Sequence, residues 1–376
     1  MKFTINRNMF LENLNNVMRA ISSRTPWPIL TGIKLNLTTA GLTLTGSDTN
    51  VSIEITIPAN EDLQIDSDGA IVLPARFFSE VIKKLPGKEF TFEVQESLQT
   101  KITSENTEFI INGVDASAYP ALPEISEENS FTISGKLLRN VINETVFAVA
   151  SQENRPTLNG VNFTFKDNKI KAVATDSHRL SQREVDIEDN PQVNTTLLIP
   201  GTSLVELARI IGENNPQVQL TPGDNQALFN VGNLSFYTRL LEGSYPDTDR
   251  LIPTTSTTSV EFDLSELAKS LERASLLTHE SRNNVVKMSL NVDNQSVKLQ
   301  GDSPELGNVE EELSFKNLQG DNLEISFNPD YLRDALRASI TEGVIMNFTQ
   351  PLRPFTIMPD KENVSFVQLI TPVRTY

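Results

Sequence analysis

One short string carries residue types that could perform nucleophilic catalysis. Asp176, Ser177 and His178 stand side by side, and His178 is one of only two histidines in the chain. A Ser-His-Asp site needs its three side chains to converge in space, whereas neighbours in a strand or a tight turn point away from one another. The string therefore predicts a turn in which the aspartate accepts backbone N–H bonds.

Other residue patterns also argue against catalysis and against a bound cofactor. The absence of cysteine excludes disulfide scaffolds, thiolate metal sites and cysteine nucleophiles. The chain contains no glycine-rich phosphate loop, HExxH zinc pair or calcium-binding loop. Its acidic runs are typical of solvated faces. We therefore expect no enzyme activity, no cofactor and no metal site.

Composition limits the compartment and the partners. The chain has 376 residues, no apolar run long enough to cross a membrane, and a strand-like start without the apolar core of a signal peptide. We expect a cytoplasmic protein of two or three domains that does not contact a membrane. The net charge of −17 argues against nucleic acid unless the positive charge is segregated.

The triplet around Asp176 is one of three similar triplets. Ser47-Asp48-Thr49 precedes it and Gly301-Asp302-Ser303 follows, each at a spacing of about one small domain. A recurring aspartate in a turn is expected to be structural, because its carboxylate can accept backbone N–H bonds. The spacing predicts a threefold repeat and a symmetric architecture.

Three further features recur with these triplets. A short strand leads into a helix after Phe3–Ile5, Phe131–Ile133 and Val260–Phe262. A second helix follows a strand and a stop at Pro74, Pro200 and Asn328-Pro329. Tyr119-Pro120 and Tyr245-Pro246 precede polar linkers. The sequence predicts an α+β fold of three domains, 1–125, 126–254 and 255–376, each with two helices against antiparallel sheets.

Charge is distributed unevenly between these predicted helices and the rest of the chain. Basic side chains outnumber acidic ones on the helices, whereas the remaining segments are strongly acidic. If the helices share one face, that face is positive on a negative body. Such a face attracts a polyanion while the rest of the protein repels it.

The repeats, the helix charge and several strings together resemble the bacterial sliding-clamp family, the beta subunit of DNA polymerase III. The resemblance covers the whole chain. Its strings are Met1–Thr4, Pro28–Leu30 after Arg24, Leu158–Gly160, Ala174–Leu180, Tyr245–Asp247 with Arg250, Arg282–Val285 and Thr371–Arg374. The family often has Gly at Ser177 and Met near Thr371 and Val373. The resemblance therefore does not determine the detailed shape of the partner-binding pocket at these positions.

The resemblance implies a ring of two chains and six DNA-clamp domains, joined head to tail around duplex DNA. Size supports this number independently. A domain of ~125 residues is about 35 Å across, so three in a ring leave a hole of only about 5 Å and six leave about 35 Å. Such a clamp raises the effective concentration of a polymerase on DNA and does no chemistry itself. The alternative is a non-enzymatic multidomain adaptor that does not encircle DNA.

The resemblance and the helix charge also assign candidate site residues. Family matches facing DNA are Arg24, Gln152 and Arg155. Helix cations expected to face DNA are Arg76, Lys83, Lys84, Arg139, Arg209, Arg273 and Arg337. In the family, partner peptides of the polymerase, the clamp loader and other clamp-binding-motif proteins enter a pocket between the second and third domains. Its matching positions are Leu158, Thr175, His178, Arg179, Leu180, Pro246, Arg250, Leu251, Leu369, Thr371, Pro372, Val373 and Arg374.

The dimer interface is expected between the first domain of one chain and the third domain of the other. The candidates are Phe77, Phe78 and Ile82 against Leu276 and Leu277, with an edge strand around Phe109 and Ile111 pairing across. Each of these residues could instead fill the core of its own domain.

Overall fold

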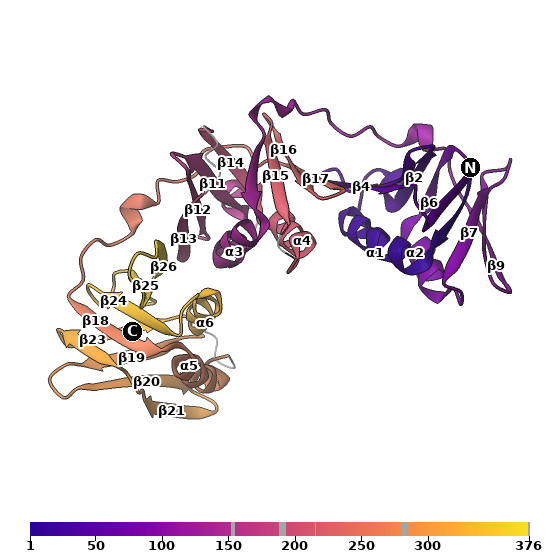
Figure 1. Cartoon of the computed structure of the whole chain (residues 1–376). Coiled ribbons are helices and arrows are strands. Elements are labelled where there is room, and N and C mark those ends of the chain that lie inside the picture. The colour runs from indigo at the N-terminus through magenta and orange to yellow at the C-terminus, as the bar shows by residue number, and fades with distance from the viewer. Residues whose placement is uncertain (152–154, 188–192, 215, 280–283, 375–376) are drawn as a thin grey trace. The chain divides into compact units, whose positions relative to one another are not determined.

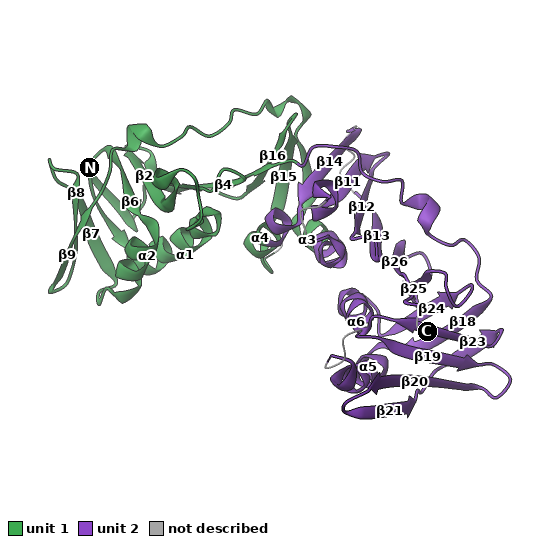
Figure 2. Ribbon diagram, turned by 180° about the vertical axis from the view of Figure 1, so that it is seen from behind, with its two compact units in different colours: residues 1–139, 206–240 green, residues 140–205, 241–376 purple. Residues whose placement is uncertain are grey.

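The computed structural model describes residues 1–151, 155–187, 193–214, 216–279 and 284–374 (Figure 1). The chain divides into two compact units, residues 1–139 with 206–240 and residues 140–205 with 241–376 (Figure 2). Gln152 lies outside the described residues. None of the described helices is long and apolar enough to span a membrane.

The first unit contains two antiparallel sheets. The five-stranded sheet has the order β5-β1-β7-β8-β9, and its strands are β1 (Lys2–Asn6), β5 (Leu63–Ser67), β7 (Glu89–Val94), β8 (Gln99–Ser104) and β9 (Thr107–Asn112). The eight-stranded sheet has the order β10-β15-β16-β17-β4-β3-β2-β6. Its strands are β2 (Gly32–Thr38), β3 (Gly41–Ser47), β4 (Val51–Pro58), β6 (Gly69–Pro74), β10 (Phe131–Ser134), β15 (Gln217–Pro222), β16 (Gln226–Val231) and β17 (Leu234–Arg239).

The second unit also contains two antiparallel sheets. The nine-stranded sheet has the order β14-β11-β12-β13-β26-β25-β24-β18-β22. Its strands are β11 (Gly160–Lys166), β12 (Lys169–Thr175), β13 (Arg179–Asp186), β14 (Thr195–Pro200), β18 (Thr258–Asp263), β22 (Asn317–Gly320), β24 (Gly343–Phe348), β25 (Phe355–Pro359) and β26 (Phe366–Ile370). The four-stranded sheet, β21-β20-β19-β23, comprises β19 (Val286–Asn291), β20 (Ser296–Ser303), β21 (Gly307–Glu312) and β23 (Leu323–Phe327).

Two α-helices occur in each predicted repeat, as expected. They are α1 (Arg7–Val17) and α2 (Ala75–Lys84), α3 (Gly135–Thr145) and α4 (Gly201–Ile211), and α5 (Leu264–Thr278) and α6 (Pro329–Ala338). Side chains cap three of them, because Asn6, Asp263 and Asn328 accept hydrogen bonds from amides of the first turn. The helices bury one apolar face against the sheets, and Phe10 and Leu14 of α1 are fully buried.

Strand pairing confirms the threefold repeat. Phe3 of β1 pairs with Phe92, Phe92 with Ile102, and Ile102 with Phe109 of β9. The second repeat gives the same series with Phe131, Leu220, Phe229 and Phe236. The third gives it with Val260, Met346, Ile357 and Gln368. Strands β9, β17 and β26 are therefore equivalent.

The aspartate turn is confirmed in two repeats, and its assignment to Asp302 is wrong. Asp48 accepts amide hydrogen bonds from Asn50 and Val51, and Asp176 accepts them from His178 and Arg179. Asp302 lies within β20 and pairs with Asn308 of β21. The β20–β21 hairpin continues for one residue pair past the position where the other two repeats turn. Asp302 therefore lies within the strand pair and not in the turn.

The glycines show where the third repeat is displaced by one residue. A Cβ on Gly46 would lie 2.9 Å from the Val17 carbonyl oxygen, and one on Gly301 would lie 2.7 Å from that of Ala274. Gly46 and Gly301 are thus equivalent positions where helix and strand approach closely. The equivalent of Asp48 is consequently Ser303, one residue beyond Asp302.

The sheets also show how successive domains are joined. Strand β4 of the first domain pairs with β17, and β13 pairs with β26 of the third domain. Strand β21 is the equivalent of β4 and β13, because each follows the same hairpin. Strands β9 and β21 are edge strands among the described residues.

Candidate functional site

The loop before β13 has a defined turn geometry. Asp176 Oδ1 accepts amide hydrogen bonds from His178 and Arg179, both at 2.9 Å, and Thr175 Oγ1 donates to the Arg179 carbonyl at 2.6 Å. Ser177 has a φ of 78°, and its equivalent Thr49 has 81°. Non-glycine residues adopt such angles at a cost of order 1 kcal/mol. A glycine at the position of Ser177 would adopt this angle without that cost.

The side chains of this loop do not form a catalytic triad. The second carboxylate oxygen of Asp176 accepts from Arg179 Nε at 3.0 Å, while the His178 ring stacks on Tyr331 with centroids 6.4 Å apart. Ser177 Oγ accepts from Arg155 Nη1 at 3.1 Å. Each side chain is thus engaged with a different group. No cluster of His, Asp and Glu that could hold a metal occurs among the described residues.

Arg179 is held between two helical segments of the second unit. Its Nη1 donates to Asp334 Oδ2 of α6 at 2.7 Å. The guanidinium carbon lies 5.6 Å from the ring centroid of Phe147, in η5 (Val146–Ala148), and 4.9 Å from that of Tyr331. Only 14% of the Arg179 side chain is exposed. Arg179 therefore holds the loop around Asp176 against α6.

An apolar cluster lies beside the loop. Val173, Leu180 and Leu369 are buried together, with Tyr245 and Ile252 packed against them. Leu180 and Leu369 are opposite each other in the β13–β26 pair. Burial raises the pKa of the Tyr245 hydroxyl, with a smaller opposing effect from the backbone of Thr175. The cluster offers an apolar floor with polar groups at its edge.

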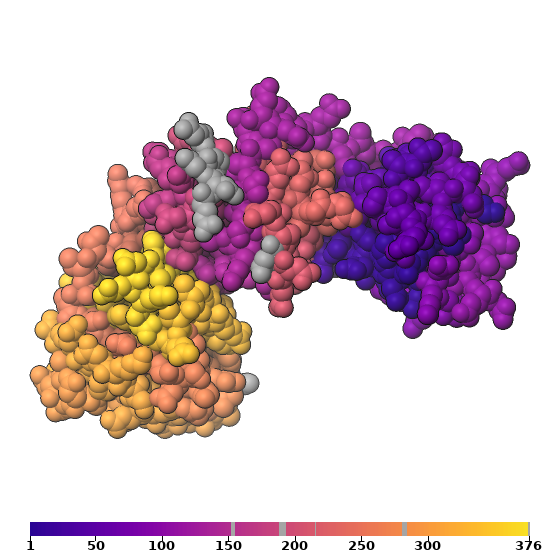
Figure 3. All heavy atoms as spheres, viewed as in Figure 1, coloured from indigo at the N-terminus to yellow at the C-terminus, as the bar shows by residue number. Residues whose placement is uncertain are grey.

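The C-terminal segment is fixed beside this cluster. The Thr371 amide donates to the His178 carbonyl at 2.9 Å, and the Val373 amide donates to the Ser326 carbonyl at 2.7 Å. Thr371, Pro372 and Val373 are partly buried. The segment lies at the surface of the second unit, yellow in Figure 3. Thr371 is thus placed against the loop residue His178, and Val373 against Ser326 of β23.

The linker after Tyr245 supplies the remaining candidates. Leu251 is half exposed in η7 (Asp249–Leu251), and Arg250 is exposed and paired with Asp247 at 2.9 Å. Pro246 lies next to Tyr245 of the cluster. Leu158 is buried in η6 (Pro156–Asn159), and its contact with the cluster stays a prediction. Sequence reasoning missed Phe147, Tyr331 and Asp334.

The predicted DNA-facing cations fall into two groups. Four have an acidic neighbour: Lys83 with Glu80, Arg139 with Glu213, Arg209 with Glu206, and Arg273 with Glu311. Among the described residues, no carboxylate lies within ion-pair distance of Arg24, Arg76, Lys84, Arg155 or Arg337. The second group is freer to bind an external anion.

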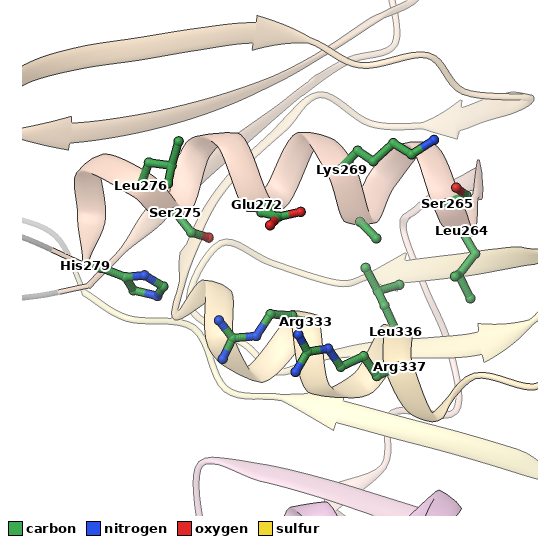
Figure 4. Close-up of a pocket in the computed structure, with 11 residues that line it drawn as sticks. Leu264, Ser265, Lys269, Glu272, Ser275, Leu276, His279, Arg333, Leu336 and Arg337 are labelled. Carbon is green, nitrogen blue, oxygen red and sulfur yellow. The ribbon is translucent and has the colours of Figure 1, made fainter.

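A groove of about 510 Å³ lies between α5 and α6. Lys269 of α5 and both Arg333 and Arg337 of α6 line it, and Figure 4 shows the two arginines extending between the helices. Arg333 pairs with Asp330 at 2.7 Å, which also contacts His279 at 3.0 Å. The groove therefore carries three cationic side chains, beside Glu272 and apolar residues, on two helices that the sequence predicts to face DNA.

The predicted dimer residues differ in exposure. Phe77 is 57% exposed and Leu276 is 69% exposed, whereas Leu277 is partly buried. Phe78 and Ile82 are fully buried in their own domain, so a role in its core replaces their predicted role in a contact with a second copy. On β9, Phe109 is half-buried and Ile111 is buried.

Comparisons with known proteins match the whole chain. Models of the DNA polymerase III beta subunit match residues 1–123 (N-terminal domain), 132–247 (central domain) and 249–374 (C-terminal domain). A beta sliding clamp of Staphylococcus epidermidis is 44% identical over 380 residues, covering all of both chains. The crystal structures of the Bacillus subtilis sliding clamp (43% identity, TM-score 0.96) and the Streptococcus pneumoniae DNA polymerase III beta chain (42%, 0.97) also cover all of both chains.

Proposed function

The chain belongs to the DNA polymerase III beta subunit family, the bacterial beta sliding clamps, and we propose which of its surfaces hold the second copy, the DNA and the partner proteins. The resemblance predicted from sequence is confirmed. The protein is a sliding clamp that gives a DNA polymerase its processivity. We assign it to the cytoplasm, without catalytic activity or cofactor.

The observation that carries the proposal is the repeated strand pairing between successive domains. Strand β4 pairs with β17 and β13 pairs with β26, whereas β21 and β9, at the edges of their sheets, have no second partner strand among the described residues. A head-to-tail contact whose rotation closes generates a ring. In the proposed dimer, β21 of each copy pairs with β9 of the other.

The repeats also give the register of this pair. Ile53, opposite Gly46, pairs with Phe236, and Ser181, opposite Ala174, pairs with Gln368. The equivalent residue on β21 is Val309, opposite Gly301. The equivalent on β9 is Phe109. Val309 therefore lies opposite Phe109 of the second copy.

The helices at the two internal junctions support the same contact. Arg19, two residues after Val17, pairs with Glu206 of α4 at 2.9 Å. At the next junction, the guanidinium of Arg179 contacts both the Phe147 ring and the Tyr331 ring of α6. The third equivalent is Leu276, two residues after Ala274.

The position of Phe77 in the second helix of its domain identifies it as the proposed neighbour of Leu276. Phe77 is the third residue after Pro74, as Tyr331 is the third after Asn328. Both Leu276 and Phe77 are more than half exposed in a single chain. Burying this apolar surface would stabilise a dimer by about 25 cal/mol per Å². In the proposed dimer Leu276 contacts Phe77 of the second copy.

DNA is held by topology and by weak contacts. The free helix cations and the basic α5–α6 groove contact phosphates, which carry no sequence information and permit sliding. Linkage to the DNA then keeps a polymerase at a high effective concentration near the primer end. We assign Arg24, Arg155, Arg76, Lys84, Lys269 and Arg337 to this role, while Gln152 lies outside the described residues.

Partner proteins bind the apolar cluster around Leu180 and Leu369. Its floor suits leucine and phenylalanine side chains of a short peptide, while the Thr371 to Val373 segment and the linker after Tyr245 form its walls. The polymerase, the clamp loader and other proteins with clamp-binding motifs are the proposed partners. We place the domain limits at 1–125, 126–254 and 255–376.

Retention on closed DNA tests encirclement. Clamps loaded onto a nicked circular plasmid should remain bound through gel filtration in moderate salt, and linearising the plasmid should release them through the ends. Equal retention on both forms would favour ordinary binding. A strict monomer by light scattering at micromolar concentration would favour the adaptor alternative.

A further inference from the structure

The only tryptophan of the chain lies on the surface beside one of the proposed DNA contacts. Trp27 is 56% exposed, although an indole is among the most favourable side chains to bury. Arg24, three residues earlier, is exposed, and no described carboxylate pairs with it. An aromatic face and a guanidinium are thus presented by one short segment.

This segment is fixed at its base. Trp27 immediately precedes η2 (Pro28–Thr31), and its carbonyl accepts from the Leu30 amide at 2.9 Å. The Trp27 amide donates to Thr25 Oγ1 at 3.3 Å. Leu30 is buried against Val72, Ala116 and Tyr119. The backbone that carries the indole is therefore ordered before any ligand binds, which lowers the entropy cost of binding.

The repeat places this indole at a position with an assigned role. Trp27-Pro28 precedes Leu30 and Gly32 as Arg155-Pro156 precedes Leu158 and Gly160, and both segments enter a short 3-10 helix. Arg155 is one of the proposed DNA contacts. The first repeat thus carries an aromatic ring where the second carries a guanidinium.

We propose that Trp27 stacks on an unpaired base of DNA, with Arg24 holding the adjacent phosphate. Base–aromatic stacking tolerates any sequence, because every base has a π-face, and it suits a protein that slides. The bases of a duplex already stack on one another, so the ligand is single-stranded DNA, as found next to a primer end. The inference rests on the proposed function, since it requires this segment to face DNA.

The fluorescence of the protein reports this contact directly, because no other tryptophan contributes. The full-length dimer is titrated at low salt with a 20-nucleotide oligothymidylate and with a blunt duplex of the same strand length. We expect saturable quenching by the single strand and little change with the blunt duplex. No quenching by the single strand, or quenching by a clamp-binding peptide alone, would overturn the proposal.

Variants separate stacking from general attraction. By anisotropy of labelled DNA, Trp27→Ala should weaken single-strand binding by about tenfold, while Trp27→Phe should retain most of it. Leu352→Ala, at another exposed apolar residue, is the matched control and should change nothing. An equal loss for single strand and blunt duplex in Trp27→Ala would overturn the proposal.

Encirclement is measured separately on the same protein. Trp27→Ala should form dimers by light scattering and be retained on nicked circles like the wild type. Failure of the wild type itself to be retained on circles would instead count against the proposed function, whatever the fluorescence shows.

Discussion

The guanidinium of Arg179 lies 4.9 Å from the ring centroid of Tyr331 and also forms an ion pair with Asp334, one helical turn further along α6. The same guanidinium bonds to Asp176 of its own turn. One side chain thus joins the loop at the peptide site to the second helix of the third domain. This relationship makes Arg179 a positioning residue whose loss should affect both stability and partner binding.

Replacing Arg179 by alanine should lower the melting temperature by roughly 5 °C and weaken partner binding. Asp334 and Asp176 would lose their shared cation in a site where Arg179 is only 14% exposed, a loss on the order of 3 kcal/mol. Arg179→Lys should be intermediate, because an ammonium cannot stack and bridge two carboxylates in the same way. Thermal unfolding and binding of a fluorescent polymerase-tail peptide measure the two effects.

Arg250→Ala is a control for stability alone, because Arg250 belongs to the proposed peptide site but its ion pair with Asp247 is 86% exposed on the arginine side. Its melting temperature should stay within about 1 °C of wild type. Loss of peptide binding in Arg179→Ala at unchanged stability would show that Arg179 contacts the peptide directly rather than positioning the loop.

Deleting Thr371–Tyr376 should abolish stimulation of the polymerase and leave the dimer intact. The deletion removes the two amides that fix the segment to the carbonyls of His178 and Ser326, and with them one wall of the peptide site. Primer extension on a singly primed circle measures the first effect, and light scattering measures the second.

A shorter deletion provides the control for the tail. Removing only Thr375 and Tyr376 retains both fixed amides, so stimulation should be preserved. Dissociation of the dimer in the longer deletion would contradict the proposed separation between partner site and ring contact.

The sequence predicted the repeat well because strand-to-helix changes and proline stops leave local signals. It assigned Asp302 to the turn wrongly, because Gly301-Asp302-Ser303 still resembles Ser47-Asp48-Thr49 although the hairpin is displaced by one residue. It also missed Tyr331 and Asp334, since contacts between segments so distant in sequence have no local signature. Asp334 could have been found from the repeat, because Glu80 and Glu206 occupy the same place on the second helix.

Tyr119→Phe should make the protein more resistant to alkaline unfolding. Burial raises the pKa of Tyr119 to about 12, against a smaller lowering by the Ser47 backbone. Because the folded pKa exceeds the unfolded value near 10, the contribution of this hydroxyl is full below pH 10 and is lost as pH rises towards 12. The loss approaches about 3 kcal/mol above pH 12 and is about half of that at pH 11.

The comparison is made by urea unfolding at pH 7 and pH 11. The Tyr119 hydroxyl is buried and makes no well-formed hydrogen bond with a described residue, although the Ser47 backbone is close enough to lower its pKa, so phenylalanine should be neutral or slightly stabilising at pH 7. Tyr245→Phe, in the equivalent place of the second repeat, should behave in the same way. A steeper alkaline loss in either variant would contradict the assigned cause.

The proposed register predicts one specific disulfide between copies. The chain has no cysteine, so Phe109→Cys with Val309→Cys introduces the only two thiols. Directly opposite residues of an antiparallel pair have Cβ atoms about 4.5–5.5 Å apart, close enough for a bridge after small adjustment. Mild oxidation should give a covalent dimer on a non-reducing gel. A DNA circle enclosed by this covalent dimer should remain linked to it after the protein is denatured.

The matched control moves one thiol by one residue. Phe109→Cys with Asn308→Cys places the two sulfurs on opposite faces of the sheet, because side chains alternate along a strand. This pair should give at least tenfold less covalent dimer at equal protein concentration. More efficient bridging in the displaced pair would show that β21 and β9 pair in another register, and no bridging in either would place the ring contact elsewhere.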